Sequence, residues 1–235
     1  MKTIGLIGGM SWESSIEYYR IINETAKEKL GGLHSAKSLM VTVDFAEIEK
    51  LQHEDRWDEA GQILVKCAQN LERGGADFIV LCTNTMHKLA DQITANVNIP
   101  FLHIADATAE KIVTAGMHRI GLLGTRFTME HDFYKGRLIN NYGLEVVIPN
   151  ETDRAIVHHV IYEELVLGKI MEASREEYKR IMNDLLSQGA QGIILGCTEI
   201  ELLIKEGDCN APLFPTTKIH AVAAVEKSLA DDPKV

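Results

Sequence analysis

The sequence lacks several features that would assign a protein to a class at once. Its four cysteines show no C-x-x-C spacing, which argues against a zinc ribbon and against a thioredoxin-type dithiol. It contains no low-complexity segment, and 46% of its 235 residues are apolar. Disordered and fibrous classes are therefore excluded, and the composition is typical of a soluble globular protein.

Long apolar runs and an excess of basic residues are also missing. No stretch approaches the ~18 apolar residues of a membrane span. The apolar part of the N-terminus, residues 4–8, is too short for the core of a signal peptide. The formal net charge of −10 argues against DNA or RNA as a partner, although a small acidic substrate is still allowed. We therefore expect a cytoplasmic protein with neither a membrane nor a nucleic acid as partner.

What the sequence does contain is an internal repeat. Residues 77–85, Asp-Phe-Ile-Val-Leu-Cys-Thr-Asn-Thr, align with residues 191–199, Gln-Gly-Ile-Ile-Leu-Gly-Cys-Thr-Glu, at an offset of 114 positions. This alignment places Thr83 on Cys197, and a Gly-Ala dipeptide precedes each copy. The first strand pattern of the chain also recurs, from His118 onward.

Short apolar runs alternate with helical patterns in both copies of the repeat. Such alternation predicts parallel sheets with helices on both faces, and the repeat predicts two pseudosymmetric α/β domains. We place the first domain at residues 1–115 and the second at 116–215, with a last helix at 216–231 that is expected to pack back onto the first domain. The expected strands are residues 3–8, 39–43, 77–81, 101–103, 118–125, 144–148, 192–196 and 213–214.

Both repeated strands end in a small side chain that bears a hydroxyl or a thiol, namely Thr83 and Cys197. Ligands bind at the carboxyl ends of parallel strands, where the free N–H groups of the next helix also point. We therefore expect the two strand ends to form one carboxylate-binding site in the cleft between the domains. The helices are predicted to run from about residue 85 to residue 95 and from Thr198. The second of them should lower the pKa of Cys197 from its reference value near 8.5.

Two other patterns indicate no site of their own. The turn Gly5-Leu-Ile-Gly8-Gly9-Met10 lacks the G-x-G-x-x-G spacing of a dinucleotide site, although its backbone can line a pocket. His158 and His159 are neighbours on a predicted helix, where their side chains diverge by about 100°, and nothing beside them completes a metal site. No metal site is predicted.

The motifs resemble those of the aspartate/glutamate racemase family, the cofactor-independent amino-acid racemases, over essentially the whole chain. Residues 196–199 match the family motif G-C-T-E in full, and residues 83–87 match C-N-T-x-H except at the first letter. The opening Gly8-Gly9-Met10-Ser11 is similar to the aspartate racemase branch, whereas cell-wall glutamate racemases carry His where Glu199 stands. The resemblance implies two pseudosymmetric domains that enclose the substrate, no metal, no pyridoxal phosphate or other cofactor, and a homodimer.

The chain departs from the family at one catalytic position. Thr83 stands where the resemblance implies the first catalytic cysteine, and a threonine hydroxyl is too weak an acid to serve as an alkoxide base. By analogy with the family, Cys197 should deprotonate the L substrate, while Thr83 at most reprotonates the opposite face. We therefore predict an isomerase, a racemase of aspartate or glutamate that prefers the L enantiomer.

Donors at the two strand ends are expected to hold the α-carboxylate and to stabilise the charge that spreads onto it. Gln52 and Lys169 are candidates for the side-chain carboxylate, and Met10 should line the pocket. Two alternatives stay open: a single-cysteine isomerase or decarboxylase of small dicarboxylic acids, and a ligand-binding protein that has lost one catalytic base. The predicted substrate-binding residues are Met10, Gln52, Asn84, Thr85, Thr125, Lys169, Thr198 and Glu199.

Overall fold

The computed structural model describes residues 1–230, and the chain forms two compact units. Unit 1 comprises Met1–Ile104 and the chain from His220 onward, and unit 2 comprises Ala105–Ile219. The sequence pattern placed the corresponding boundaries near residues 115 and 215. The difference arises at two helices, α5 (Ile104–Thr114) and α11 (Thr216–Leu229), each of which starts in one unit and continues in the other.

Unit 1 is built on a four-stranded parallel sheet in the order β2-β1-β3-β4. Its two central strands are fully buried, as expected when helices cover both faces of a parallel sheet, whereas its two edge strands are only partly buried. The strands are β1 (Ile4–Gly8), β2 (Ser38–Thr42), β3 (Phe78–Leu81) and β4 (Phe101–Leu102). The helices of this half of the chain are α1 (Trp12–Leu30), α2 (Phe45–His53), α3 (Trp57–Arg73), the 3-10 helix η1 (Thr85–Leu89) and α4 (Ala90–Thr94).

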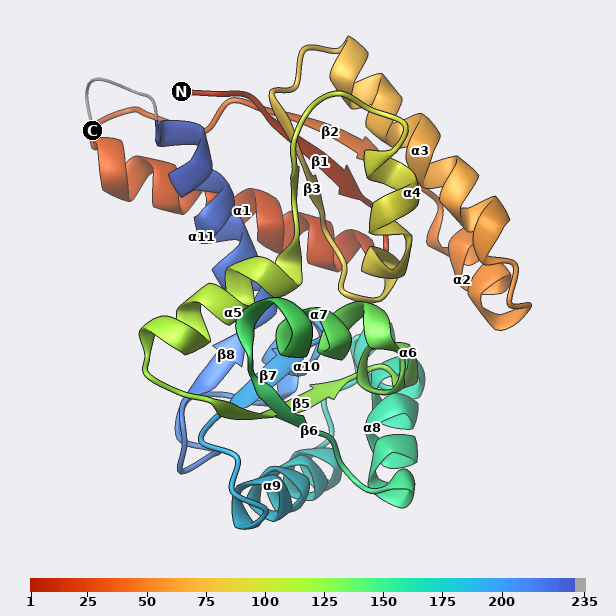
Figure 1. The fold of residues 1–235 in the computed structure, drawn as a ribbon, viewed down its shortest axis with the longest axis vertical. Helices are drawn as coiled ribbons and strands as arrows, with labels where there is room; N and C mark the ends of the chain where they lie inside the picture. Colours follow the sequence, from red (N-terminus) through yellow and green to blue (C-terminus); the bar gives the residue numbers. More distant parts are fainter. Residues whose placement is uncertain (231–235) are drawn as a thin grey trace. The chain divides into compact units, whose positions relative to one another are not determined.

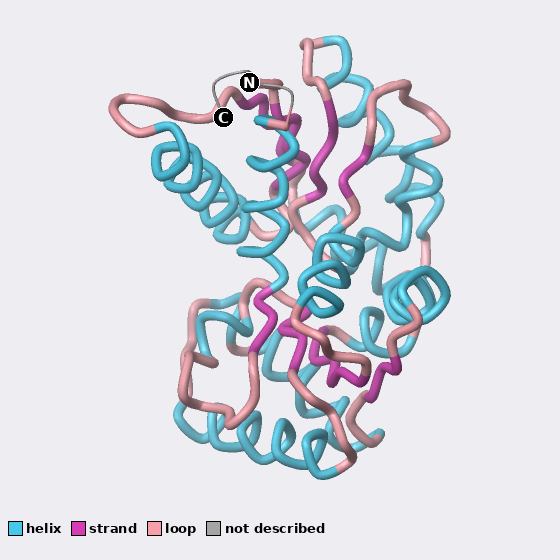
Figure 2. The backbone as a smooth tube through the Cα atoms, turned by 60° about the vertical axis from the view of Figure 1, so that its left-hand side comes forward, coloured by secondary structure: helices cyan, strands magenta, loops and turns pink. Residues whose placement is uncertain are grey.

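Unit 2 repeats this plan, with the sheet order β6-β5-β7-β8 and all neighbours parallel. Its strands are β5 (Arg119–Gly124), β6 (Glu145–Val147), β7 (Ile193–Gly196) and β8 (Leu213–Pro215). Its further helices are α6 (Arg126–Glu130), α7 (Asp132–Tyr142), α8 (Glu151–Glu163), η2 (Leu165–Leu167), α9 (Glu172–Ser187) and α10 (Ile200–Leu203). Helices flank the strands of both sheets (Figure 2), so the predicted α/β class with two domains is confirmed.

The strand register shows that the sequence repeat is also a structural repeat. Gly5 of β1 lies opposite Ile79 of β3, and Gly121 of β5 lies opposite Ile193 of β7. The residues that align in the sequence therefore occupy the same position in their own sheets. It follows that the ends of β3 and β7 are equivalent places in the two units.

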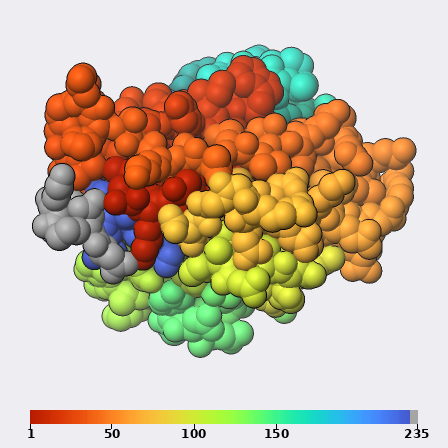
Figure 3. Space-filling view, turned by 90° about the horizontal axis from the view of Figure 1, so that it is seen from above, coloured from red at the N-terminus to blue at the C-terminus, as the bar shows by residue number. Residues whose placement is uncertain are grey.

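Helix α3 illustrates how the units bury their apolar residues. Ala60, Leu64, Ala68 and Leu71 recur at helical spacing and are buried, whereas Asp58 and the other polar residues of the helix face outward. The outer face of α3 is part of the gold and orange surface in Figure 3. Its apolar face covers the sheet of unit 1.

The last helix completes the core of unit 1. Four apolar residues of α11, the blue helix in Figure 1, are buried in one cluster with residues of β1, β3 and α1. His220 of the same helix is fully buried and accepts a hydrogen bond from the hydroxyl of Tyr18 on α1, 2.8 Å away. The four apolar residues are Ala221, Ala224, Val225 and Leu229.

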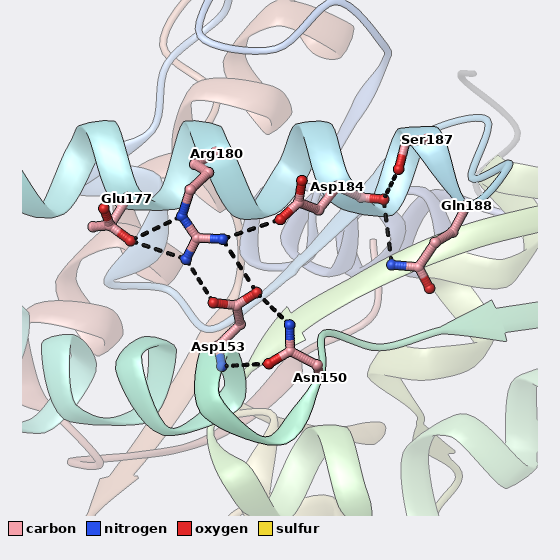
Figure 4. Close-up of polar contacts among 7 residues, drawn as sticks. All are labelled: Asn150, Asp153, Glu177, Arg180, Asp184, Ser187 and Gln188. Carbon is pink, nitrogen blue, oxygen red and sulfur yellow. Dashed lines mark hydrogen bonds and ion pairs between the residues drawn. The ribbon is translucent and has the colours of Figure 1, made fainter.

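An ion-pair network joins α8 to α9 within unit 2 (Figure 4). The carboxylate of Asp153 is buried and accepts hydrogen bonds from Arg180 and from the side-chain amide of Asn150. Glu177 and Asp184, one turn to either side of Arg180, accept from the same guanidinium. The guanidinium lowers the pKa of the Asp153 carboxyl.

Two predicted helices differ from the sequence pattern, one in its type and one in its start. The helix expected over residues 85–95 starts as the 3-10 helix η1, because the N–H of His87 pairs with the carbonyl of Asn84, three residues earlier. The helix expected from Thr198 begins only at Ile200 and spans four residues. The predicted end of the last helix, residue 231, lies outside the described residues. Within residues 1–230, no helix is both long enough and apolar enough to cross a membrane.

Candidate active site

The carboxyl ends of β1 and β3 lie beside each other in unit 1, because Ile7 pairs with Leu81. The hydroxyl of Ser14, in the first turn of α1, donates to the carbonyl of Cys82 at 3.1 Å. Gly9, between β1 and α1, has a φ of +94°, and a Cβ there would lie 2.3 Å from the carbonyl oxygen of Val43. Only glycine allows this close turn, which carries Met10 to the strand ends.

Burial singles out one side chain on the segment that follows β3. From Phe78 to His87, every residue is buried except Thr83, which is partly exposed. Cys82 is fully buried in the core of unit 1, and this burial raises the pKa of its thiol. We call residues 82–87 the Thr83 segment, since Thr83 is the side chain in it that a ligand can reach.

Other predicted site residues of unit 1 lie in or against the Thr83 segment. Asn84 and Thr85 belong to it and are buried. Gln52 of α2 is buried as well, and its amide nitrogen lies 2.8 Å from the sulfur of Met86, so α2 is in contact with the segment. Met10 is buried in the turn after β1.

Unit 2 repeats this geometry at the ends of β5 and β7, where Gly124 pairs with Gly196. Thr125 follows β5 and caps α6, because its hydroxyl accepts the N–H of Thr128. From Gly192 to Ile200, every residue is buried except Cys197, which keeps some exposed surface. We call residues 197–199 the Cys197 segment.

The thiol of Cys197 donates a hydrogen bond to the carboxylate of Glu199, with the sulfur 2.9 Å from Oε2. The side chain is partly buried, and this burial raises the pKa of Cys197 well above its ordinary value. The negative charge of Glu199 and its hydrogen bond raise the pKa further, while the backbone N–H of Glu199 opposes this effect only in part. The predicted lowering of the Cys197 pKa is therefore wrong. Helix α10 is short, starts after Glu199, and cannot offset a carboxylate in contact with the thiol.

Of the remaining predicted residues of unit 2, Thr198 is buried and Lys169 is exposed. Thr198 is buried, and its hydroxyl accepts a hydrogen bond from the hydroxyl of Thr217 at 3.0 Å. Thr217 also donates its backbone N–H to Glu201. Lys169 is exposed, in the loop that follows Gly168, and its backbone N–H pairs with the carbonyl of Glu164.

Sequence reasoning missed one contact in the Thr83 segment and one buried tyrosine of unit 2. His87 bonds to the carbonyl of Thr83, a contact that the C-N-T-x-H spacing places within one helical turn. In unit 2, Tyr178 of α9 is buried, which raises its pKa, and its hydroxyl donates to the carbonyl of Val157. In the sequence, Tyr178 resembles an ordinary core residue, so no sequence signal identifies it. Across residues 1–230, no group of three or more His, Cys, Asp or Glu side chains is placed to hold a metal ion.

Comparison with known proteins identifies relatives along nearly the whole chain. The Broad specificity amino-acid racemase RacX of Bacillus subtilis is 24% identical over 173 residues, which is 74% of each protein. A candidate Asp/Glu racemase from Yersinia pestis has 56% sequence identity and a TM-score of 0.92, covering 97% of this chain and 100% of that one. An aspartate racemase homologue from Pyrococcus horikoshii has 37% identity and a TM-score of 0.84, covering 97% of this chain and 99% of that one.

The family model for Asp/Glu/Hydantoin racemase matches residues 7–224, a range that includes the Thr83 and Cys197 segments. This match covers most of the sequence, and the structural relatives agree with it. The chain therefore belongs to the Asp/Glu/hydantoin racemase family, a family of isomerases.

Proposed function

We propose that this protein is a cofactor-independent racemase of acidic amino acids that acts preferentially on the L enantiomer. In this proposal Cys197 removes the α-proton of L-aspartate or L-glutamate, and Thr83 faces the opposite side of the α-carbon. One observation carries the proposal. At two equivalent strand ends, each otherwise buried, the side chains left accessible are Thr83 and Cys197. The names of the relatives, which refer to aspartate and to a broad range of amino acids, support the reaction class.

The contact between Cys197 and Glu199 suggests how the base is generated. The thiol is protonated at rest and already shares its proton with the carboxylate, 2.9 Å away. Transfer of that proton to Glu199 leaves a thiolate and a neutral carboxylic acid, and the thiolate then takes the α-proton. Because the proton moves along an existing hydrogen bond, the pair of Cys197 and Glu199 carries one negative charge both before and after the transfer. In this proposal Glu199 receives the proton of the thiol.

The substrate carbanion is stabilised as negative charge spreads onto its α-carboxylate. Donors of the Thr83 and Cys197 segments, among them Asn84, Thr85 and Thr198, are proposed to bind that carboxylate. Thr125 is proposed to assist them from the end of β5. Gln52 and Lys169 are proposed to bind the side-chain carboxylate, and Met10 to line the pocket. Glu199 is assigned to Cys197 rather than to the substrate.

Because Thr83 carries a hydroxyl and Cys197 a thiol, the two faces of the substrate α-carbon meet different catalytic groups. A hydroxyl can donate its proton to the carbanion while it regains one from water, but it does not form a stable alkoxide near neutral pH. The enantiomers of an amino acid have equal free energy in water, so kcat/KM for complete racemisation must be the same from either side. The L preference must therefore appear in α-proton exchange, which one base can catalyse on one face.

The test is α-proton exchange in D₂O, followed by proton NMR with L- and D-aspartate and L- and D-glutamate. We expect exchange from the L enantiomers to be much faster than exchange from the D enantiomers, and racemisation to be slower than L exchange. Replacement of Cys197 by Ser should abolish L exchange. Cys209→Ser is the matched control, because Cys209 is also a partly exposed free cysteine and lies outside both segments.

Other outcomes separate this proposal from its competitors. Absence of exchange with acidic and other amino acids, together with a thermal shift on L-aspartate binding, would indicate a binding protein that has lost catalysis. Turnover of maleate without α-proton exchange would indicate a dicarboxylate isomerase. Exchange that survives Cys197→Ser would remove Cys197 from the mechanism.

A homodimer in the cytoplasm is part of the same proposal. The dimer rests on the family resemblance. Sedimentation of the purified protein, compared with the 26.2 kDa mass of one chain, tests the dimer.

A further inference from the structure

His87 lies in the Thr83 segment, and both nitrogens of its ring make hydrogen bonds. Nδ1 is 2.7 Å from the carbonyl oxygen of Thr83, and Nε2 is 3.2 Å from the backbone nitrogen of Ile104. Only 2% of the residue is exposed. The ring therefore bridges Thr83 and Ile104 without contact to bulk water.

The two partners fix the protonation state of His87. A carbonyl oxygen only accepts hydrogen bonds, so Nδ1 must carry a proton, whereas a backbone N–H only donates, so Nε2 must be bare. The neutral tautomer with the proton on Nδ1 is the one state that satisfies both contacts. A proton on Nε2 would face the N–H of Ile104, and the imidazolium form is disfavoured for the same reason. His87 is thus unsuited to carry a proton to or from a substrate.

Neighbouring rings hold the imidazole in place. The ring centroids of His103 and Phe101 lie 4.5 Å and 5.5 Å from that of His87, both in edge-on arrangements. The ring of His220 lies 5.8 Å away, and His220 is itself held between Tyr18 and the carbonyl of Leu102. A ring packed in this way has little freedom to turn, so the position of the Thr83 carbonyl is tied to it.

The partner at Nε2 has a defined place in the fold. Ile104 is the first residue of α5, where backbone N–H groups have no acceptor within the helix. It is also the last residue of unit 1 before the chain enters unit 2. The imidazole therefore links the carbonyl of Thr83 to the backbone N–H at the start of α5.

We propose that His87 is a positioning residue that orients Thr83 through this carbonyl and so controls protonation on the D face of the substrate. The inference rests on the proposed racemase function. It predicts that loss of the bond to Thr83 slows the step that uses Thr83 but leaves the step that uses Cys197 unchanged. A residue that only maintained the fold would affect both steps alike.

Two amide variants test the hydrogen bonds of the two ring nitrogens separately. In His87→Asn the side-chain amide occupies the position of Nδ1, so its N–H still donates to the Thr83 carbonyl. In His87→Gln the amide oxygen reaches the position of Nε2 and accepts from Ile104, but the bond to Thr83 is lost. For each variant we would measure L-aspartate α-proton exchange, racemisation and the midpoint of thermal unfolding.

We expect His87→Gln to lower the ratio of racemisation to L exchange about tenfold, the loss that corresponds to one misplaced proton donor. His87→Asn should keep this ratio within about twofold of the native value. Equal loss of both activities in His87→Gln, or an unchanged ratio, overturns the proposal.

A measurement on the native protein does not depend on how the variants fold. The ¹⁵N shifts of the His87 ring should show a protonated Nδ1 and a bare Nε2, and either the other tautomer or an imidazolium contradicts the inference. If the native protein catalyses no exchange with any amino acid, the racemase proposal fails. The ring measurement would still decide whether His87 is held as described.

Discussion

Cys197 is held as a thiol by its burial and by the carboxylate of Glu199, which accepts its proton in a hydrogen bond. Transfer of that proton to Glu199 leaves the charge of the pair unchanged and so does not itself depend on pH, whereas loss of the proton to water forms the thiolate in full as the pH rises. At the scale of single residues, the pH dependence of L exchange is therefore governed by this pair. Deprotonation from the L side should increase with pH beyond the range where an ordinary cysteine, with a pKa near 8.5, would already be ionised.

Replacement of Glu199 by Gln should lower the pKa of Cys197. The change removes both the negative charge and the charged acceptor that favour the thiol, while burial of the sulfur is kept. We expect the midpoint of the pH–rate profile for L-aspartate exchange to move to lower pH. Below that midpoint the rate should fall, because the thiol is protonated there and the variant has no carboxylate to take its proton.

Glu201→Gln is the matched control for this experiment. Glu201 is the weakest of the causes that raise the pKa of Cys197, and its carboxylate accepts the backbone N–H of Thr217 instead. Its removal should move the midpoint by much less. A midpoint that stays in place or rises in Glu199→Gln would contradict the role assigned to Glu199.

Replacement of Thr83 by Cys should supply the base that the D face lacks. The position is partly exposed within a buried segment, so a thiol there remains accessible. We expect α-proton exchange from D-aspartate to increase at least tenfold, and racemisation to accelerate equally from both enantiomers. Thr83→Ser, which keeps a hydroxyl, is the control and should not accelerate D exchange. If Thr83→Cys gains no D exchange, Thr83 does not face that side of the substrate.

At the scale of elements, the packing of α8 on α9 depends on one buried carboxylate. Asp153 is 6% exposed and Arg180 is 43% exposed in their side chains, so water screens part of the attraction between them. The guanidinium lowers the pKa of Asp153 in the folded protein. The resulting stability is complete above the unfolded-chain pKa near 3.9 and is lost as the pH falls through the folded-state pKa.

We expect Asp153→Asn to lower the free energy of unfolding by about 1–2 kcal/mol at pH 7, and by less at pH 3, where the carboxyl of the unfolded native chain is already protonated. Urea unfolding of both proteins at the two pH values measures this difference. Asp184→Asn removes an exposed partner of the same arginine and should cost less than about 0.5 kcal/mol. Equal losses in the two variants would show that burial of Asp153 contributes nothing.

At the scale of the whole molecule, unit 1 depends on residues from the far end of the chain. Leu229 of α11 is 3% exposed within the cluster that contains Ile4 and Phe78. Leu229→Ala should therefore destabilise the protein by about 2–4 kcal/mol, because it leaves a cavity in a core that α1 and the sheet also build. Thermal or urea unfolding measures the loss. Leu167→Ala, at a site that is 59% exposed, is the control and should cost under about 1 kcal/mol.

Much of this architecture follows from local patterns in the sequence. Buried parallel strands need uninterrupted apolar runs, and the two copies of such a run, at residues 77–85 and 191–199, indicated the paired sheets. The family motifs placed Thr83 and Cys197 at the strand ends. The 3-10 type of η1 did not follow, because the backbone pairing between His87 and Asn84 differs by one residue from α-helical pairing, and propensity does not resolve that difference.

The sequence by itself determined the α/β class, the repeat and the unequal pair Thr83 and Cys197, because each of these is written in residue type and spacing. The tertiary structure decided the state of those residues. Whether Cys197 rests as thiol or thiolate depends on the orientation of the Glu199 carboxylate, and whether His87 carries protons depends on its contact with Ile104, 17 residues away. Charge and hydrogen bonding act through distances in space, and the sequence fixes those distances only once the chain is folded.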